Sequence, residues 1–167
     1  MEKNKFIVKI PKFYDERGFF QKVFQSKNFN SHIKKVNQIN LSFSKKKGTV
    51  RGMHYQKGKH KEEKILTCLK GKIFLVIVNI NKDSDIYLKK KYFEIDDKEF
   101  KFIKIPKDYS VGFQTLTKNS LILYLHTKNY SDKHQGQINP KDPKLNIKWP
   151  NKITSISNRD KLYKFIQ

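Results

Sequence analysis

Residues 51–56 read Arg-Gly-Met-His-Tyr-Gln and contain the side chains of this sequence that are best suited to chemistry. His54 stands between Arg51 and Gln56, and Asp160 follows far downstream in Ser-Asn-Arg-Asp. Histidine has the unperturbed pKa nearest neutrality, and a carboxylate behind it fixes its tautomer and stabilises the imidazolium. The combination indicates a base that could take a proton from carbon. A lone histidine on a strand, however, is more often structural.

Other kinds of catalytic site find less support in the sequence. A metal site needs three or four His, Cys, Asp or Glu side chains that converge, and Gln56 stands where the second ligand of a His-x-His pair would be. The five histidines, which show no ligand spacing, are His32, His54, His60, His126 and His134. Cys68 lies in the apolar run 65–69 and is predicted to be a small core residue. No Gly-x-Ser-x-Gly elbow or glycine-rich phosphate loop is present.

Length and composition predict one domain, residues 1–167, that is large enough to bury a core. A single cysteine excludes an intrachain disulfide framework and fits a reducing compartment. The N-terminal residues include no apolar signal region, and no stretch approaches the roughly 20 apolar residues that span a bilayer. We therefore expect a cytoplasmic protein with no membrane partner.

The net charge of +22 raises the possibility of nucleic-acid binding, but the distribution of charge argues against it. Only Arg17, Arg51 and Arg159 are arginines, and the many lysines are spread along the whole chain. A nucleic-acid reader is expected to favour the planar arginine fork. We interpret most lysines as a solvated surface, and we expect no nucleic-acid partner. The positive field would still attract an anionic ligand such as a phosphate-bearing small molecule.

The candidate base must be positioned by strands, because alternation with period two recurs along the chain. Strands are predicted at residues 6–10, 20–24, 36–43, 50–56, 64–69, 72–80, 91–95, 100–105, 111–116 and 121–127. Lys70-Gly71 predicts a tight hairpin between two of them. Helical periodicity is confined to residues 27–33 and 161–165. The segment after Tyr130 is predicted to wrap irregularly over the strands, so that the fold is an all-β sandwich or barrel.

Several segments of the chain resemble the dTDP-4-dehydrorhamnose 3,5-epimerase family, in the same order as in that family. The Arg-Gly-x-His-x-Gln core is the most specific of them, and the similarity extends over nearly the whole chain. The matching segments are residues 15–18, 38–42, 48–56, 112–116, 142–143, 147–150 and 157–160.

The resemblance implies a small cupin-type jelly-roll barrel that forms a homodimer and works without metal or organic cofactor. It also implies a nucleoside-diphosphate 4-keto-6-deoxy sugar as substrate, epimerised at C3 and C5. His54 matches the base of the family and Asp160 its partner. Lys64 matches a lysine that would stabilise the enolate at the C4 oxygen, and Tyr124 matches the tyrosine that returns a proton from the opposite face.

The resemblance also assigns substrate-binding residues. Arg51 and Arg159 match basic residues near the diphosphate and sugar, and Arg17 matches an arginine of the nucleotide site. The remaining assignments are Gln38 and Asn40, which would line the pocket, and Gln56 of the core motif. All three arginines thus fall on binding motifs, as suits bidentate recognition of a diphosphate.

Departures from the family pattern leave the exact substrate open. They are Val111 in place of a histidine, Leu75 in place of an aspartate, Lys22 and Gln135 in place of acidic residues, and Leu125 in place of a lysine. The proposed proton-transfer residues are retained, whereas recognition of the sugar or the base could differ. Two alternatives stay open: a 3,4-ketoisomerase acting on a similar nucleotide sugar, and a non-catalytic cupin that binds a nucleotide sugar or glycan.

Overall fold

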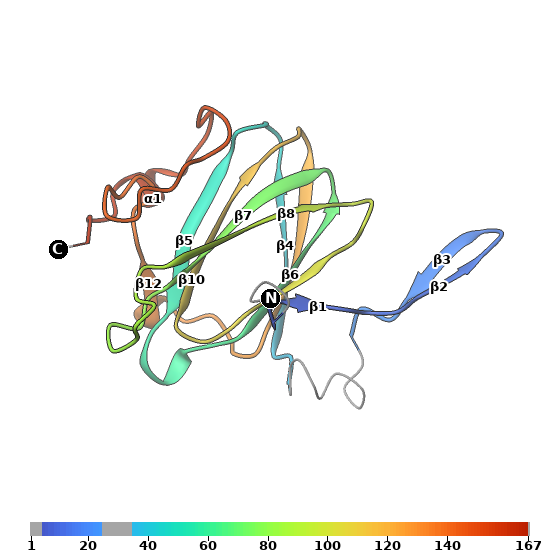
Figure 1. The fold of residues 1–167 in the computed structure, drawn as a ribbon, viewed down its shortest axis with the longest axis horizontal. Coiled ribbons are helices and arrows are strands. Elements are labelled where there is room, and N and C mark those ends of the chain that lie inside the picture. Colours follow the sequence, from blue (N-terminus) through green and yellow to red (C-terminus); the bar gives the residue numbers. More distant parts are fainter. Residues whose placement is uncertain (1–4, 25–34, 167) are drawn as a thin grey trace.

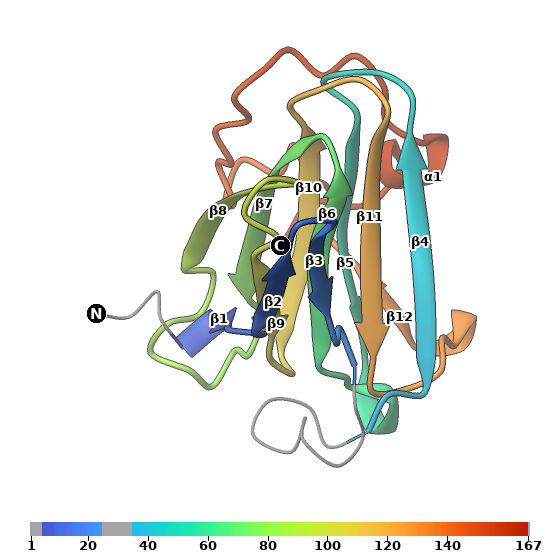
Figure 2. The same cartoon turned by 90° about the vertical axis from the view of Figure 1, so that its right-hand side faces the viewer.

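Two five-stranded antiparallel sheets face each other and form the body of the protein (Figures 1 and 2). The computed structural model describes residues 5–24 and 35–166. The first sheet has the order β1 (Ile7–Val8), β9 (Phe102–Ile105), β6 (Lys64–Lys70), β11 (Ser120–His126) and β4 (Gln38–Ser44). The second has the order β12 (Gln135–Gln137), β5 (Val50–Gln56), β10 (Tyr109–Thr115), β7 (Lys72–Asn79) and β8 (Lys90–Asp96). The predicted all-β class is confirmed.

A separate two-stranded hairpin extends from the barrel near the N-terminus (Figure 1). It pairs β2 (Lys12–Asp15) with β3 (Gly18–Gln21) around the predicted turn at residues 15–18. The second strand of this hairpin was predicted at residues 20–24, whereas β3 begins at Gly18 and ends at Gln21. Phe13, Tyr14 and Phe20 are exposed on the hairpin, which therefore makes little use of the core of its own chain.

The predicted tight hairpin at Lys70-Gly71 is wrong, because β6 and β7 lie in different sheets. Gly71 has φ +81° and donates its N–H to the Asp97 carboxylate at 2.7 Å. A Cβ at this position would lie 2.4 Å from the Thr117 hydroxyl oxygen, so only glycine fits the corner. Alternating apolar residues separated by Lys-Gly are compatible with either a hairpin or a corner. Here β6 pairs with β9 and β11, and β7 pairs with β8 and β10.

The helix predictions were less accurate than the strand predictions. Residues 27–33 lie outside the described residues. The helix predicted at residues 161–165 is wrong: the C-terminal helix α1 is Asn158–Lys161. Ser157 begins this helix, since its hydroxyl accepts the N–H of Asp160 at 3.0 Å. A serine three residues before an acidic residue is the sequence signal of such a start. Short 3-10 turns occur at η2 (Gly58–His60) and η3 (Asp132–His134).

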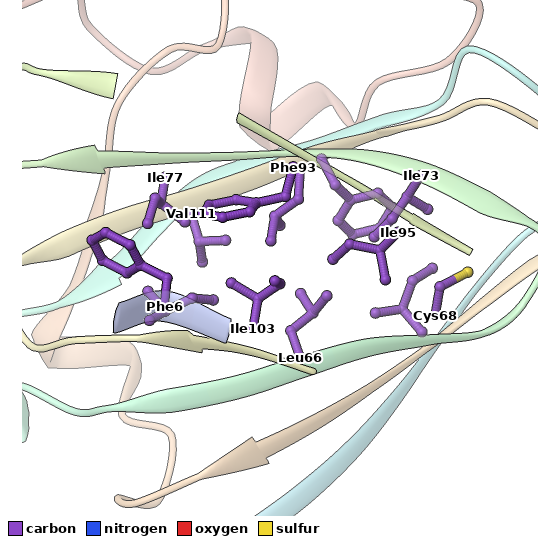
Figure 3. Close-up of a cluster of buried hydrophobic side chains, with 13 residues drawn as sticks. Phe6, Leu66, Cys68, Ile73, Ile77, Phe93, Ile95, Ile103 and Val111 are labelled. Carbon is purple, nitrogen blue, oxygen red and sulfur yellow. The ribbon is translucent and has the colours of Figure 1, made fainter. Parts of the chain in front are cut away.

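The main hydrophobic core fills one side of the space between the sheets (Figure 3). Ile73, Ile77 and Phe93 from the second sheet meet Leu66 and Ile103 from the first. Cys68 is fully buried in the same cluster, as predicted for a small core residue. Apolar side chains thus fill the space between the sheets near β1, β8 and β9. Near β4 and β5, polar side chains line the space between the sheets.

The segment after Tyr130 covers the outer face of the second sheet, as predicted (Figure 1). Ile138 and Leu145 pack against Met53, Val76 and Val78 of that sheet. The same segment contributes the unpredicted strand β12, which pairs with β5 along Gln56, Tyr55 and His54. The wrap therefore buries the back of the strand that carries the candidate base. No helix long and apolar enough to cross a bilayer occurs among the described residues.

Candidate active site

A cavity of about 930 Å³ opens between the two sheets on the side that the apolar core leaves free. Strands β4, β6 and β11 form one wall, and β5 and β10 form the other. The predicted residues that line it are Gln38, Asn40, Arg51, His54, Gln56, Lys64, Tyr124, Arg159 and Asp160. Nine predicted side chains from distant parts of the sequence therefore meet in one space.

A β-bulge allows Arg51 and His54 to face the same cavity. Three residues apart, they would point to opposite faces of a regular strand. The pairing with β10 shows the extra residue, because Val111 is opposite His54 while Phe113 is opposite Arg51. Gly52 has φ +130°, and a Cβ there would lie 2.4 Å from the Cα of Gly112. The glycine in the Arg-Gly-x-His motif is thus a geometric requirement.

His54 and Asp160 form a hydrogen-bonded pair in this cavity. The His54 Nε2 lies 2.9 Å from Asp160 Oδ1, and the aspartate side chain is only 3% exposed. Asp160 Oδ2 also accepts the Gly52 N–H at 3.3 Å. Burial by itself would raise the pKa of Asp160, but the hydrogen bonds and charges of His54, Gly52 and Arg159 together lower it. With the Nε2 proton directed at a carboxylate, the lone pair lies on Nδ1, which can act as the base.

Lys64 and Tyr124 lie on the opposite wall of the cavity, on the neighbouring strands β6 and β11. The Lys64 ammonium pairs with Glu62 at 3.2 Å, and both side chains are buried. Burial raises the pKa of Tyr124, an effect that the nearby Arg51 charge partly offsets. The phenol therefore keeps its proton at neutral pH. The His54–Asp160 pair and the Tyr124 phenol thus stand on opposite walls of one space.

The predicted binding residues differ in how freely they face the cavity. The Arg51 guanidinium is held by Ser44 Oγ at 3.2 Å and the Phe43 carbonyl at 3.0 Å. Arg159 lies at the rim, with its side chain 55% exposed. Gln56 lines the cavity, but its amide oxygen accepts the Ser131 N–H at 2.9 Å and its nitrogen donates to the Asn129 carbonyl. Gln56 therefore anchors the loop at residues 129–131.

Arg17 is the one predicted binding residue that the structure does not bring to the cavity. It lies at the tip of the β2–β3 hairpin, which projects away from the barrel (Figure 1). Its guanidinium pairs with Asp15 at 2.6 Å, and its side chain is 82% exposed. Within a single chain, the hairpin does not extend toward the lining residues.

Among the lining residues that were not predicted, Glu62 and His126 form a pair of titratable groups. His126 Nδ1 lies 3.0 Å from Glu62 Oε2, and Tyr124 stacks on the His126 ring with 5.8 Å between ring centroids. The signal that could have identified them is period two: His126 is two residues after Tyr124 on one strand face, and Glu62 is two before Lys64.

The family-variant positions Val111 and Leu75 belong to the hydrophobic core. Both are buried in the cluster with Phe113, and Val111 also lines the cavity. At Val111 the cavity wall is therefore apolar where the family resemblance would place a histidine, whereas Leu75 lies in the core behind it. Leu125 points outward into a second cluster with Ile65. Among the described residues, no group of three His, Cys, Asp or Glu side chains is arranged to hold a metal ion.

Comparisons with known proteins agree on one family. The sequence profile of dTDP-4-dehydrorhamnose 3,5-epimerase matches residues 3–167. The enzyme of that name from Sinorhizobium fredii is 32% identical over 152 residues, which are 90% of this chain and 78% of the relative. The crystal structure of the Bacillus anthracis enzyme with TDP and PPi bound has a TM-score of 0.90 at 27% identity, covering 96% of this chain and 93% of that one. The Legionella pneumophila enzyme in complex with dTDP-4-keto-L-rhamnose has a TM-score of 0.86 at 29% identity, covering 95% and 86%.

Proposed function

The chain belongs to the dTDP-4-dehydrorhamnose 3,5-epimerase family, and we propose that it epimerises a nucleoside-diphosphate 4-keto-6-deoxy sugar at C3, C5 or both. The reaction is an isomerisation and needs no cofactor, since a base, an acid and a stabilising charge suffice. The observation that carries this proposal is the placement of the His54–Asp160 pair and Tyr124 on opposite walls of one cavity.

Proton removal begins the proposed reaction. His54 Nδ1 takes the proton from the carbon beside the ketone, and the electrons of the broken C–H bond move to the C4 oxygen. The resulting enolate is stabilised by the Lys64 ammonium, while Asp160 stabilises the imidazolium of His54. A buried cation is most effective here, because the surrounding protein weakens its charge less than water would.

Proton return completes the inversion. The enolate collapses back to the ketone and takes the Tyr124 proton on the face opposite His54. His54 is then protonated and Tyr124 ionised, so both must exchange a proton with water before the next cycle. The raised pKa of Tyr124 favours rapid reprotonation of the phenolate.

The diphosphate and nucleotide contacts fit the cationic residues of the chain. Arg51 inside the cavity and Arg159 at its rim offer bidentate donors for phosphate oxygens. The ligands in the related structures support this assignment, since one holds TDP and PPi and another a dTDP-linked keto sugar. The charge of the chain as a whole would draw such an anion toward the cavity.

We further infer that the protein acts as a homodimer. Strand β4 is the edge of its sheet, and Ile39, Leu41 and Phe43 on its outer face are 57%, 64% and 48% exposed. Such an apolar edge invites pairing with another copy. In that arrangement the projecting hairpin could place Arg17 at the cavity of the partner, which accounts for an arginine that its own cavity does not use.

Deuterium exchange tests the proposed activity. The protein is incubated in deuterated water with dTDP-4-keto-6-deoxyglucose and with GDP- and CDP-linked analogues, and the products are analysed by NMR. Deuterium should enter C3, C5 or both, and His54→Ala should abolish incorporation. Movement of the keto group to C3 would instead identify a 3,4-ketoisomerase. If no sugar exchanges, the activity proposed above is wrong.

A further inference from the structure

Glu62 is a buried carboxylate that contacts two other polar side chains of the cavity wall. One oxygen lies 3.2 Å from the Lys64 ammonium, and the other lies 3.0 Å from His126 Nδ1. The three side chains are 4%, 11% and 12% exposed, so water contributes little to their solvation. Lys64 and His126 are also direct partners across the β6–β11 pairing. Glu62 thus joins two strands at the point where Lys64 enters the cavity.

The hydrogen-bond chain beyond His126 determines where its proton lies. The backbone N–H of Tyr130 can only donate, and it donates to Gln38 Oε1 at 2.8 Å. Gln38 must therefore donate through Nε2 to Asn40 Oδ1, at 3.0 Å. Asn40 in turn presents Nδ2 to His126 Nε2, at 3.3 Å. Since an amide NH₂ only donates, His126 Nε2 must accept, and the ring proton lies on Nδ1, facing Glu62.

This polarity leaves His126 neutral and Glu62 ionised. Burial by itself would raise the pKa of Glu62, but the hydrogen bond from His126 and the charge of Lys64 lower it overall. Lys64 is therefore the cation of this wall, balanced by one carboxylate. His126 adds no second positive charge, and its ring stacks on Tyr124 with an interplanar angle of 20°.

We propose that Glu62 and His126 are positioning residues for the epimerisation: the carboxylate fixes the Lys64 ammonium, and the neutral imidazole both orients that carboxylate and supports the Tyr124 ring. This inference rests on the proposed function, because it assigns Lys64 and Tyr124 their roles there. It adds a second histidine–carboxylate pair to the cavity, on the wall opposite His54 and Asp160.

The proton position can be tested without substrate. Long-range ¹H–¹⁵N NMR of the labelled protein should show one histidine with a protonated Nδ1 and an unprotonated Nε2, and the signal should vanish in His126→Gln. In Glu62→Gln the same resonance should change, because one of the two accepting oxygens becomes an NH₂ that cannot accept from Lys64 or His126. A His126 protonated on Nε2, or on both nitrogens, would overturn the assigned hydrogen-bond chain.

The positioning role is tested by kinetics on the full-length protein with the sugar that shows exchange. Glu62→Gln should lower kcat about 10- to 100-fold, the effect expected when a hydrogen bond to a charged group is lost, with KM nearly unchanged. Glu63→Gln is the matched control, since Glu63 pairs with Lys104 away from the cavity. It should behave as the wild type.

Two variants of His126 keep the test decisive if Glu62→Gln does not fold. His126→Gln keeps an N–H that can reach Glu62 but loses the ring against Tyr124, so it should lose less of kcat than Glu62→Gln does. His126→Phe keeps a ring against Tyr124 but removes the donor, and should lose activity as Glu62→Gln does. Wild-type kcat in Glu62→Gln, or in His126→Phe, would refute the positioning role. An inactive wild type would refute the proposed function instead.

Discussion

At the scale of single residues, each side chain in the proposed mechanism depends on a neighbour for its chemical state. Asp160 directs the proton of His54 to Nε2, and the Glu62 carboxylate balances the positive charge of the buried Lys64 ammonium. The sequence predicted His54, Asp160, Lys64 and Tyr124 through their motifs. It did not predict Glu62 and His126: period two puts each of them on the same side as Lys64 or Tyr124, but their contact follows only from the pairing of β6 with β11.

Tyr124→Phe should separate proton removal from proton return. The variant retains His54 and Lys64, so the enolate still forms and the proton on the His54 side exchanges with deuterium. Inversion should fall by about 10²- to 10⁴-fold, the usual contribution of a general acid. Measuring deuterium incorporation and epimer ratio in the same NMR sample checks this. His54→Ala is the reference that should lose both, and a Tyr124→Phe protein that inverts at the wild-type rate would exclude Tyr124 as the acid.

Asp160→Asn should reduce stability in a pH-dependent way. The native pKa of Asp160 is below its ordinary value of 3.8, so the unfolded chain binds this proton more readily. The carboxylate therefore stabilises the fold fully above about pH 4, and the contribution is lost as pH falls through the native pKa. We expect a loss of about 1–3 kcal/mol in the free energy of unfolding at pH 7, shrinking toward pH 3.

Urea unfolding of Asp160→Asn and wild type at several pH values measures this difference. The exposed Asp83→Asn substitution is the control and should cost little at any pH. A stability difference between Asp160→Asn and wild type that stays constant from pH 6 to pH 3 would contradict the assignment.

At the scale of elements, the bulge in β5 is what places Arg51 and His54 in one cavity. Gly52 and Gly18 have nearly the same φ, +130° and +132°, in the region that only glycine adopts readily. Only Gly52 lies against another chain segment, since nothing lies within 4 Å of a Cβ at Gly18. The two glycines therefore separate the effect of backbone strain from the effect of close packing.

Gly52→Ala should destabilise the protein more than Gly18→Ala. Both substitutions incur a backbone cost of about 1–3 kcal/mol, and Gly52→Ala adds an overpacking cost of about 1–3 kcal/mol against Gly112. Thermal unfolding of both variants measures the difference. Gly52→Ala should also lose activity, because separating β5 from β10 moves Arg51 and His54. Equal melting temperatures for the two variants would show that the close contact costs nothing.

Strand positions were predictable from period two, but pairing was not. Strand β5 has the bounds predicted for it, and most other predicted strands deviate by a few residues at their ends, whereas β2 and β12 were not predicted. The corner at Gly71 was mistaken for a hairpin, since local alternation carries no information about which sheet the next strand joins. The bulge was hidden for the same reason: Gly52 is visible in the sequence, but its effect on facing depends on β10.

At the scale of the whole molecule, the β2–β3 hairpin is the element that one chain does not explain. Its aromatic side chains are exposed, and the Arg17 side chain at its tip is 82% exposed, against 55% for Arg159 at the cavity rim. In the homodimer proposed above, these residues would contact the partner, and each cavity would take its hairpin arginine from the other chain. This arrangement predicts that defects in Arg17 and His54 complement each other between subunits.

Arg17→Ala should raise KM for the nucleotide sugar about 10-fold, the effect of losing a hydrogen bond to a charged group, although Arg17 lies outside its own cavity. A mixed dimer of one Arg17→Ala chain and one His54→Ala chain, purified through two different tags, then holds one cavity with an intact His54 and an intact partner hairpin. By two-fold symmetry it should show about half the wild-type activity with the wild-type KM. The control is a mixed dimer of one His54→Ala chain and one Arg51→Ala chain. Each of its two cavities carries one defect of its own chain, so mixing should restore no activity. If the Arg17 mixture keeps the raised KM, the hairpin serves its own chain.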